Sequence, residues 1–555
     1  MTLPLVLAGP IVRRVESRFS SFWVALSKPA VVTAHVWPAF QQSKGIGQVE
    51  SGDPLVATGS APTVPFGAAF HVAVVTARAP ASMQPGSIFS YDLSFAPVGG
   101  GFTATHLKAQ GLLADESESG PRLEGVDPDA PRHLALGYLP GRLPSFVTPA
   151  AAVIDLRLAQ ASCRNGMADG ADAMSFLDEE HKLNLADPAA RIQQLFLTGD
   201  QIYADDVPRS MMKSVGGLAE ELIGGAGEQL PVGGNQVKLS LRNFPILRRL
   251  KLVRVDARLS TTDGHNHMLG FGEFAALHLL AWSTRVWRKL TEADDIYVDP
   301  NTGATKSEIA DHLTEWEECA PPGKDRLADV AGWRKHETTL QKGQVKPTLE
   351  VDLGRTNVYR GTVAKAARLL ANCATYMIFD DHEITDDWNL NKRWRNQVIS
   401  NPLGRAILRN GLMAYTVCQG WGNDPRGFTR ADASIFDPLD GLPAPAAGSP
   451  IWALKKPTSP GEAEKLTNNG KLMKATHDAL DGPGPYPAGS HTDIESCSAS
   501  TIPTPEPTSS SRRTRRPNST TSSTARSTGW SCSTRGPTAR IAASSWRNPT
   551  CWDPR

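Results

Sequence analysis

The sequence predicts an α/β protein in which an N-terminal β-sandwich, residues 1–145, precedes a layered α/β core, residues 150–495. Short β-favouring runs fill the first part, and apolar strands alternate with helical stretches in the second. From residue 496 onward, most of the apolar residue types that build a core are absent. A chain of 555 residues also exceeds a single compact core, because domains usually have about 50 to 250 residues. We therefore expect two domains and a tail.

The first 145 residues contain runs that are rich in β-branched and aromatic side chains. These runs occupy positions 22–26, 30–37 and 69–75, and Gly, Pro and Ser separate them. Short strands at this spacing are typical of a small antiparallel sandwich. Residues 144–151 then predict a linker into the next domain.

The pattern changes near residue 150, where apolar strands begin to alternate with long helical stretches. Strands are predicted at 153–161, 195–198 and 376–379, and helices at 271–290, 362–373 and 401–419. Strands separated by helices indicate an α/β core whose parallel strands end at a common edge.

The segment 496–555 differs in composition from the rest of the chain. It contains no Leu, Val, Phe, Met or Lys, and it has two acidic residues and nine Arg among many Ser, Thr and Pro. Such a segment cannot bury a core, so we predict that it is disordered. GC-rich coding DNA yields this composition when it is read out of phase. We therefore expect a frameshift that truncates the core at its C-terminal end and leaves it incomplete.

Composition and charge argue against several classes of function. A net charge of +1 provides no field that would attract nucleic acid or an anionic membrane. Seven cysteines without a C-x-x-C pair argue against a disulfide scaffold or a zinc ribbon. Neither an export signal nor an apolar run long enough to span a bilayer is found, so a cytoplasmic location is expected. Motifs of serine hydrolases, zincins and Walker-type kinases are also missing.

Two acidic clusters follow predicted strands. The first comprises Gly199, Asp200, Tyr203, Asp205 and Asp206, and the second comprises Asp380, Asp381, His382, Glu383, Asp386 and Asp387. In α/β proteins ligands bind at the carboxyl ends of parallel strands. Because carboxylates crowded around a histidine repel one another, we expect a cation between them.

A third cluster adds softer ligand types. It consists of Ser162, Cys163 and Arg164, with Asp169 and Asp172 just beyond. Carboxylate oxygens suit Ca²⁺, Mg²⁺ or Mn²⁺, whereas thiolate and phenolate groups suit iron. The combined set predicts a mixed or iron-containing dinuclear site.

The strings around these residues closely resemble PhoD-like phosphatases of the metallophosphatase, or calcineurin-like, superfamily. The matching strings are Ala-Ser162-Cys163-Arg164, Gly199-Asp200-Gln-Ile-Tyr203-Ala-Asp205, Phe379-Asp380-Asp381-His382-Glu383, Asp386-Asp387-Trp388-Asn389 and Gln419-Gly-Trp-Gly-Asn423. The resemblance covers residues 150–425. It implies a calcineurin-like α-β-β-α core of two sheets flanked by helices, with metal ions at the strand ends.

The resemblance also implies a dinuclear or multinuclear metal site, with Fe³⁺ and Ca²⁺ or another divalent ion. Six residues would hold the metals: Cys163, Asp172, Asp200, Tyr203, Asp380 and Asp381. Asp200 would bridge the two ions, and Asp169 competes with Asp172 for its place. We expect Cys163 and Asp200 to lie within about 12 Å of each other, as a shared metal shell requires.

His382 and Arg164 are the expected catalytic residues. His382 would contact the phosphate or donate a proton to the leaving oxygen, and Arg164 would hold a substrate phosphate. Each also has a structural interpretation, since His382 could simply bond a carboxylate and Arg164 could pair with a structural acid.

Two further groups are interpreted structurally. Asp205 and Asp206 fit acids at a helix N-cap. His265 and His267 resemble a Gly-His-x-His metal signature, but they precede the second acidic cluster and lead into an apolar helix. We interpret them as part of a pocket wall or a helix entry.

The expected function is metal-dependent hydrolysis of a small-molecule phosphate mono- or diester, without a nucleic-acid or membrane partner. If the C-terminal part of the metal site is missing, activity would be weak or absent. The alternative is a non-catalytic truncated relic or a binding protein. The sequence gives no prediction of the oligomeric state.

Overall fold

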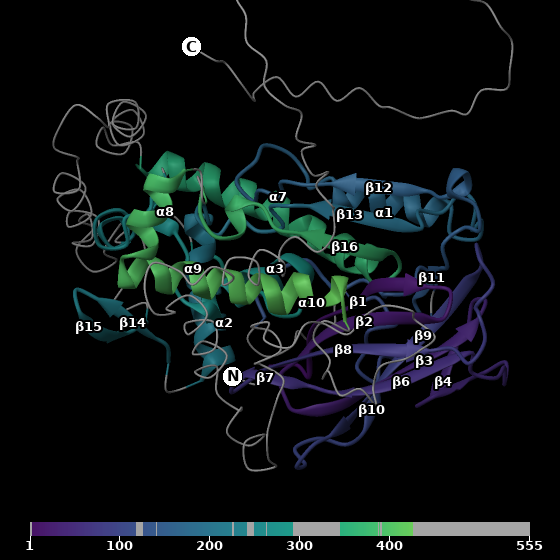
Figure 1. Ribbon diagram of the computed structural model, residues 1–555. Coiled ribbons are helices and arrows are strands. Elements are labelled where there is room, and N and C mark those ends of the chain that lie inside the picture. The colour runs from purple at the N-terminus through teal and green to yellow at the C-terminus, as the bar shows by residue number, and fades with distance from the viewer. Residues whose placement is uncertain are drawn as a thin grey trace, which may run out of the picture. The chain divides into compact units, whose positions relative to one another are not determined.

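The computed structural model describes residues 3–117, 126–139, 141–224, 227–240, 249–261, 264–291, 345–386, 388 and 391–425. These residues belong to one compact unit that mixes helices with sheets and has a β-rich N-terminal part (Figure 1). The expected α/β class and β-rich start are thereby confirmed. The calcineurin-like layering and the domain limits stay predictions. The tail at 496–555, with its predicted disorder and frameshift, lies outside the described residues.

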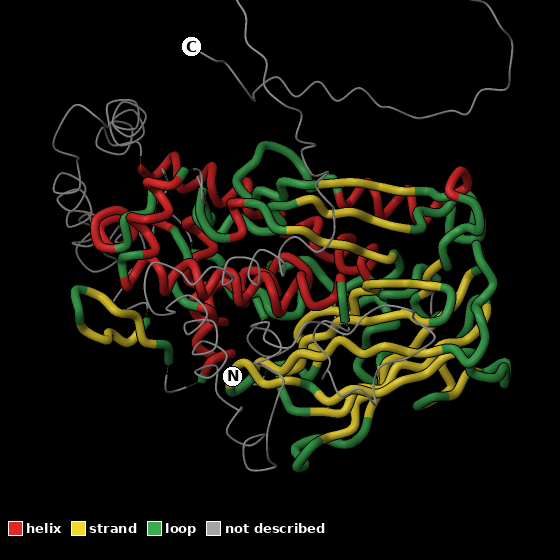
Figure 2. The backbone as a smooth tube through the Cα atoms, viewed as in Figure 1, coloured by secondary structure: helices red, strands yellow, loops and turns green. Residues whose placement is uncertain are grey.

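The N-terminal part is built from eleven strands among the described residues. They are β1 (Val6–Glu16), β2 (Phe19–Leu26), β3 (Ala30–Pro38), β4 (Ser43–Gly45), β5 (Gln48–Val49), β6 (Ala57–Pro62), β7 (Val64–Gly67), β8 (Phe70–Arg78), β9 (Ile88–Pro97), β10 (Thr105–His106) and β11 (Ser145–Val147). Nine of them form a curled antiparallel sheet in the order β1-β2-β8-β6-β3-β9-β10, with β7 on β8 and β11 on β9 (Figure 2). The β4–β5 pair is separate.

Both faces of this sheet are covered around β2, where every residue is buried. Successive side chains of a strand point to opposite faces, so Trp23 and Ala25 enter one hydrophobic cluster while Phe22 and Val24 enter another. A continuous apolar run is the pattern that a strand covered on both sides requires.

The remaining strands and helices follow β11 in the chain. The strands are β12 (Leu158–Ala161), β13 (Gln194–Thr198), β14 (Gln229–Val232), β15 (Asn235–Lys238) and β16 (Ala374–Ile378). The helices are α1 (Met174–Leu183), α2 (Met212–Ile223), α3 (Phe271–Trp282), α7 (Val345–Leu370), α8 (Lys392–Ile399), α9 (Pro402–Tyr415) and α10 (Trp421–Asn423). No helix among the described residues is both long enough and apolar enough to cross a membrane.

Trp23 ties the N-terminal sheet to these helices. Its ring packs edge-to-face on Trp282 of α3, with ring centroids 5.6 Å apart. Its indole N–H donates to the carbonyl of Val417 at 2.8 Å, so this buried polar group is satisfied.

The strands β12, β13 and β16 form a small parallel sheet in that order. Ala161 pairs with Leu197, and Leu197 pairs with Met377, so the three strands end at the same level. Leu195 and Leu197 are fully buried on one face, while Phe196 stacks on Tyr376 on the other, at 5.3 Å between centroids. This register brings the three loops that start at residues 162, 199 and 379 to one edge.

The outer edge of β16 is paired with a side-chain amide. Asn423 Oδ1 accepts from the N–H of Met377 at 3.0 Å, and Asn423 Nδ2 donates to the Met377 carbonyl. Arg13 of β1, which is fully buried, donates to Asn423 Oδ1 and to the Gln419 carbonyl, both at 2.8 Å. Burial lowers the pKa of Arg13 to about 10. The motif at 419–423 thus closes a sheet edge.

Several element limits differ from the predictions. The predicted strand at 153–161 pairs only over Leu158–Ala161, because residues 153 and 154 form an exposed turn in which Ile154 is 91% exposed. Helix α3 ends at Trp282, since Ser283 takes extended backbone angles. Helix α9 ends at Tyr415 and continues as a π-helical turn, η8 (Thr416–Gly420).

Arg191 joins three elements from a fully buried position. It donates through Nε to His181 Nε2 at 2.8 Å, through Nη1 to Ser145 Oγ at 3.0 Å, and through Nη2 to the carbonyls of Ser145 and Asn372. We expect Arg191→Met to lower the free energy of unfolding by about 3 kcal/mol or more, because each buried group left unpaired costs about 1–3 kcal/mol. Urea unfolding measures this loss.

The matched control is Arg355→Met. Arg355 pairs with Asp169, whose side chain is 86% exposed, and such surface pairs contribute about 0–1 kcal/mol. An equally small loss in the Arg191 variant would contradict the role given to its buried bonds.

Candidate metal centre

The loops after β12 and β13 begin with residues in unusual backbone conformations. Gly199 has a φ of 113°, Asp200 a φ of 53° and Cys163 a φ of 58°. The N–H of Cys163 donates to the Gly199 carbonyl at 3.2 Å, and the N–H of Arg164 donates to the Asp200 carbonyl at 2.8 Å. The two loops are therefore held side by side just beyond the sheet.

Positive φ is costly for residues with a Cβ, at about 1–3 kcal/mol each. The described residues contain four such non-glycine positions, namely Ala39, Cys163, Asp200 and Arg258. Two of these four are predicted metal ligands. Strain retained at this edge is typical of a functional site.

Asp200 occupies the centre of this edge and is only 4% exposed. Its Oδ2 accepts from Cys163 Sγ at 3.3 Å. Its Oδ1 is buried and has no hydrogen-bond partner among the described residues. Burial raises the pKa of Asp200 to about 6; the charge of His382 and the Cys163 bond oppose this rise, and the nearby carboxylates of Asp380 and Asp381 add to it.

Asp200, Asp381 and His382 each offer a ligand atom, and these atoms lie within 4.8 Å of one another. In the part of the chain that the structure describes, no other group of three or more His, Cys, Asp or Glu side chains meets this condition. A buried carboxylate oxygen without a partner, beside two more ligands, fits a hard cation. The residues present therefore fit a metal ion.

His382 is oriented by Asp205 and Tyr203. Its Nδ1 bonds both carboxylate oxygens of Asp205, at 2.9 and 3.1 Å, and its ring stacks on Tyr203 with centroids 4.2 Å apart. Burial opposes a charge on the ring, but the hydrogen bond and charge of Asp205, with Asp200 and Asp381, raise the pKa of His382 to about 9. Because Nδ1 is engaged, Nε2 is the nitrogen that can meet a metal ion or a substrate.

The contact of Asp205 with His382 was not predicted from the sequence, where Asp205 was assigned to a helix N-cap. Asp205 is 1% exposed, and besides holding His382 it accepts from the N–H of Asp386. His382 lies 177 residues after Asp205 in the sequence. The spacing of Asp205 within its own cluster therefore does not predict this contact.

Cys163 and Tyr203 supply a sulfur and a phenol oxygen beside Asp200. Burial raises the pKa of the Cys163 thiol. The hydrogen bonds with Ser162 and Tyr203 lower this pKa, whereas the hydrogen bond and charge of Asp200 raise it. Burial also raises the pKa of the Tyr203 phenol. Cys163, Tyr203 and Asp200, three of the six metal ligands that the resemblance implied, thus lie close together. Their role as ligands stays a prediction.

Asp380 contacts the Asp200 loop from the β16 side. It is the N-cap of the short turn η7 (Asp381–Glu383), where its Oδ1 accepts from the Asp381 N–H at 3.0 Å. A Cβ on Gly199 would lie 2.4 Å from Asp380 Cβ, so only glycine fits at residue 199. Metal binding by Asp380 itself stays a prediction.

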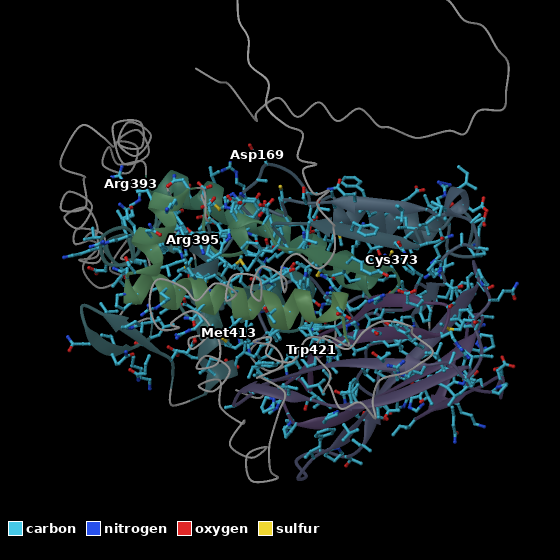
Figure 3. All side chains as sticks on the ribbon, viewed as in Figure 1. Asp169, Cys373, Arg393, Arg395, Met413 and Trp421 are labelled. Atoms are coloured by element: carbon cyan, nitrogen blue, oxygen red, sulfur yellow. The ribbon has the colours of Figure 1, made fainter. Side chains whose placement is uncertain are left out.

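Arg164 and Asp172 contact each other. Arg164 Nη2 and Nε donate to Asp172 Oδ2 at 2.7 and 2.9 Å, and Nη2 also reaches the Ala281 carbonyl at 3.2 Å. Both side chains are almost fully buried. Asp169, labelled in Figure 3, pairs instead with Arg355 at the surface. Phosphate binding by Arg164 and metal binding by Asp172 therefore remain predictions, and this ion pair would have to open for either.

His267 lies before α3 and is fully buried. Its Nδ1 is 2.6 Å from the Met268 carbonyl, while its Nε2 has no hydrogen-bond partner among the described residues. It is not part of the three-residue group. This position agrees with a helix entry, as the sequence suggested.

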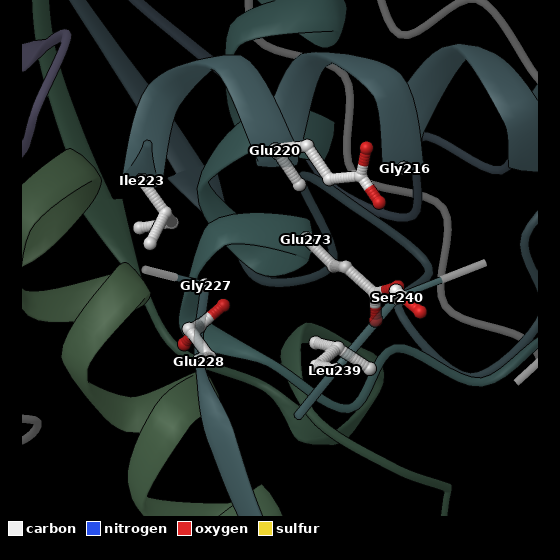
Figure 4. Close-up of a pocket in the computed structure, with 9 residues that line it drawn as sticks. Gly216, Glu220, Ile223, Gly227, Glu228, Leu239, Ser240 and Glu273 are labelled. Atoms are coloured by element: carbon white, nitrogen blue, oxygen red, sulfur yellow. The ribbon is translucent and has the colours of Figure 1, made fainter. Parts of the chain in front are cut away.

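A small cavity opens elsewhere, beside α2 and the start of α3 (Figure 4). It has a volume of about 30 Å³, and Glu220, Glu228, Leu239 and Glu273 are among its lining residues. Such a volume holds about one or two water molecules. It contains none of the predicted site residues and is too small for a phosphate ester.

Comparisons with known proteins give little beyond this geometry. The chain is similar to a solved structure described as "Structure of PhoD", at 10% sequence identity and a TM-score of 0.31. The similarity covers 75% of this chain and 46% of that chain, so the chain spans about half the length of the structure it matches. No protein-family model and no curated protein matches.

Proposed function

We propose that this protein is a metal-dependent phosphoesterase whose site is formed by Asp200, Asp381 and His382. The observation that carries the proposal is the buried Asp200 oxygen without a partner, close to an Asp381 oxygen and a His382 nitrogen at the ends of parallel strands. The resemblance of the surrounding strings to PhoD-like phosphatases supports the same chemistry. A bound metal would act as a Lewis acid on a phosphoryl oxygen.

The protein's own residues have separate tasks in this proposal. Asp200 and Asp381 hold the cation, with Cys163 and Tyr203 beside Asp200. Asp205 fixes the ring of His382, so that Nε2 is directed to contact the phosphate or to give a proton to the leaving oxygen. A small phosphate mono- or diester is the proposed substrate.

The full chain, freed of metal by a chelator, is expected to bind added Mn²⁺ and then hydrolyse p-nitrophenyl phosphate or its bis-ester. Turnover should disappear again when the chelator is restored, because the carboxylates alone cannot polarise the ester. Calorimetry and release of p-nitrophenol measure the two steps.

The results also separate this function from its alternative. Binding of Mn²⁺ without turnover of either ester would favour a non-catalytic binding protein. Absence of Mn²⁺ binding would reject the site altogether.

A further inference from the structure

Glu383 lies beneath the candidate metal centre and is fully buried. Its Oε2 accepts from the N–H groups of Asp200 and Asp380, both at 2.9 Å. Its Oε1 accepts from the N–H of Gln201 at 2.7 Å and from Gln419 Nε2 at 3.1 Å. One carboxylate thus receives four hydrogen bonds.

These bonds connect two different loops. The bond from Asp380 belongs to a capping box at the start of η7, where the Asp-x-x-Glu spacing is a known sequence signal. The bonds from Asp200 and Gln201 cross to the loop after β13. Without the carboxylate, buried N–H groups of both loops would face one another with no acceptor, at a cost of about 1–3 kcal/mol for each group.

Gln419 and His278 fix the position of Glu383 from the side away from the ligand loops. Gln419 Nε2 also lies 3.1 Å from His278 Nε2, and His278 Nδ1 is 2.8 Å from the Phe274 carbonyl in α3. Burial lowers the pKa of His278 to about 4, so the ring is neutral and its Nε2 accepts from Gln419. The orientation of the Gln419 amide is thereby fixed toward Glu383.

We propose that Glu383 is the positioning residue that sets the separation between Asp200 on one loop and the Asp381 and His382 pair on the other. Those ligand atoms lie within 4.8 Å of one another only while the two loops keep their spacing. This inference rests on the proposed metal site but not on hydrolysis. Glu383 would act through the ligands without touching the metal.

A carboxamide cannot replace this carboxylate. In Glu383→Gln the side-chain NH₂ would face either Asp200 and Asp380 or Gln201 and Gln419, all of which present N–H donors. We expect Mn²⁺ to bind this variant about 10- to 100-fold more weakly, as for other residues that orient metal ligands. In the metal-free variant, amide exchange at residues 200, 201 and 380 should accelerate.

Glu228 provides a matched control. It is also buried, and it accepts from two successive N–H groups, those of Phe271 at 2.7 Å and Gly272 at 2.8 Å. These bonds lie at the start of α3, not between the ligand loops. We expect both Glu228→Gln and Glu383→Gln to lower the urea midpoint, because each places an amide NH₂ against buried N–H donors. Glu228→Gln should nevertheless keep the Mn²⁺ affinity and the three amide exchange rates of the unmodified protein.

Several outcomes would overturn the proposal. They are an unchanged Mn²⁺ affinity in folded Glu383→Gln, an equal loss in Glu228→Gln, or unchanged exchange at the three amides. If Glu383→Gln does not fold, Gln419→Leu removes one donor and keeps the carboxylate, and normal Mn²⁺ affinity there overturns the proposal. If the unmodified protein does not bind Mn²⁺, the proposed function fails, while the amide exchange still decides whether Glu383 holds the loops.

Discussion

Asp200→Asn is expected to abolish binding of Mn²⁺ and, with it, any ester hydrolysis. Asp200 belongs to the three-residue group whose ligand atoms lie within 4.8 Å of one another, and its Oδ1 is the buried oxygen without a partner. Substitution of a residue that only orients a metal ligand lowers metal affinity by roughly 10- to 100-fold. Loss of a ligand itself should lower the Mn²⁺ affinity by more than this. Calorimetric titration of the folded variant with Mn²⁺ measures the loss.

The same substitution should stabilise the metal-free protein. An amide removes a buried negative charge that faces Asp380 and Asp381, and its NH₂ gives those carboxylates a donor. Relief of an unsatisfied buried group is worth about 1–3 kcal/mol, which urea unfolding in chelator would show. A loss of stability would indicate that Oδ1 already has a favourable environment.

Asp169→Asn is the control for this experiment. Asp169 follows the Cys163 loop in sequence, but its side chain is 86% exposed and pairs with Arg355. We expect its substitution to change neither the Mn²⁺ affinity nor the free energy of unfolding. An Asp200 variant that behaves like the Asp169 variant would reject Asp200 as a ligand.

The meeting of the acidic clusters could be predicted from sequence because it depends only on position along strands. Asp200 and Asp380 each follow a strand of the same parallel sheet, and the ends of such strands share an edge. Cys163 joins them for the same reason, since β12 is the third strand. The positions of the strands in the sequence are therefore enough to predict that these distant residues lie close together.

The choice of partner within the cluster could not be predicted in this way. Whether Arg164 faces a substrate or Asp172 depends on the direction of its side chain, and in the structure it turns into the protein toward Asp172. Asp205 meets His382 because the loops after β13 and β16 contact each other, as the bond from the Ala204 N–H to the His382 carbonyl also shows. Sequence spacing states where a residue stands relative to a strand end, but not which neighbour its side chain faces.

For the fold, too, the sequence predicts the type of an element but not the elements that pack against it. The β2 run is apolar at successive positions, which indicates a strand covered on both faces but does not name what covers it. In the structure α3 supplies part of that cover through the contact of Trp282 with Trp23. The strand limits at 153–161 were wrong at their N-terminal end, because apolar residues there lie in an exposed turn.

Gly199→Ala is expected to damage both stability and metal binding. The residue has a φ of 113°, which side chains rarely adopt, and its new Cβ would lie 2.4 Å from Asp380 Cβ. The backbone conformation alone costs roughly 1–3 kcal/mol. Relief of the contact would push the Asp380 loop away from Asp200 and widen the separation of the ligands. Urea unfolding and Mn²⁺ titration of the variant measure the two effects.

Gly217→Ala is the matched control for this substitution. Gly217 lies inside α2, and an added Cβ there meets no atom within 4 Å. Because alanine is favoured over glycine in a helix by about 1 kcal/mol, this variant should be slightly more stable and should bind Mn²⁺ normally. If Gly199→Ala matched it in both measurements, the close approach of the two strand-end loops at Gly199 and Asp380 would be refuted. The metal centre would then not depend on the glycine that allows these loops to meet.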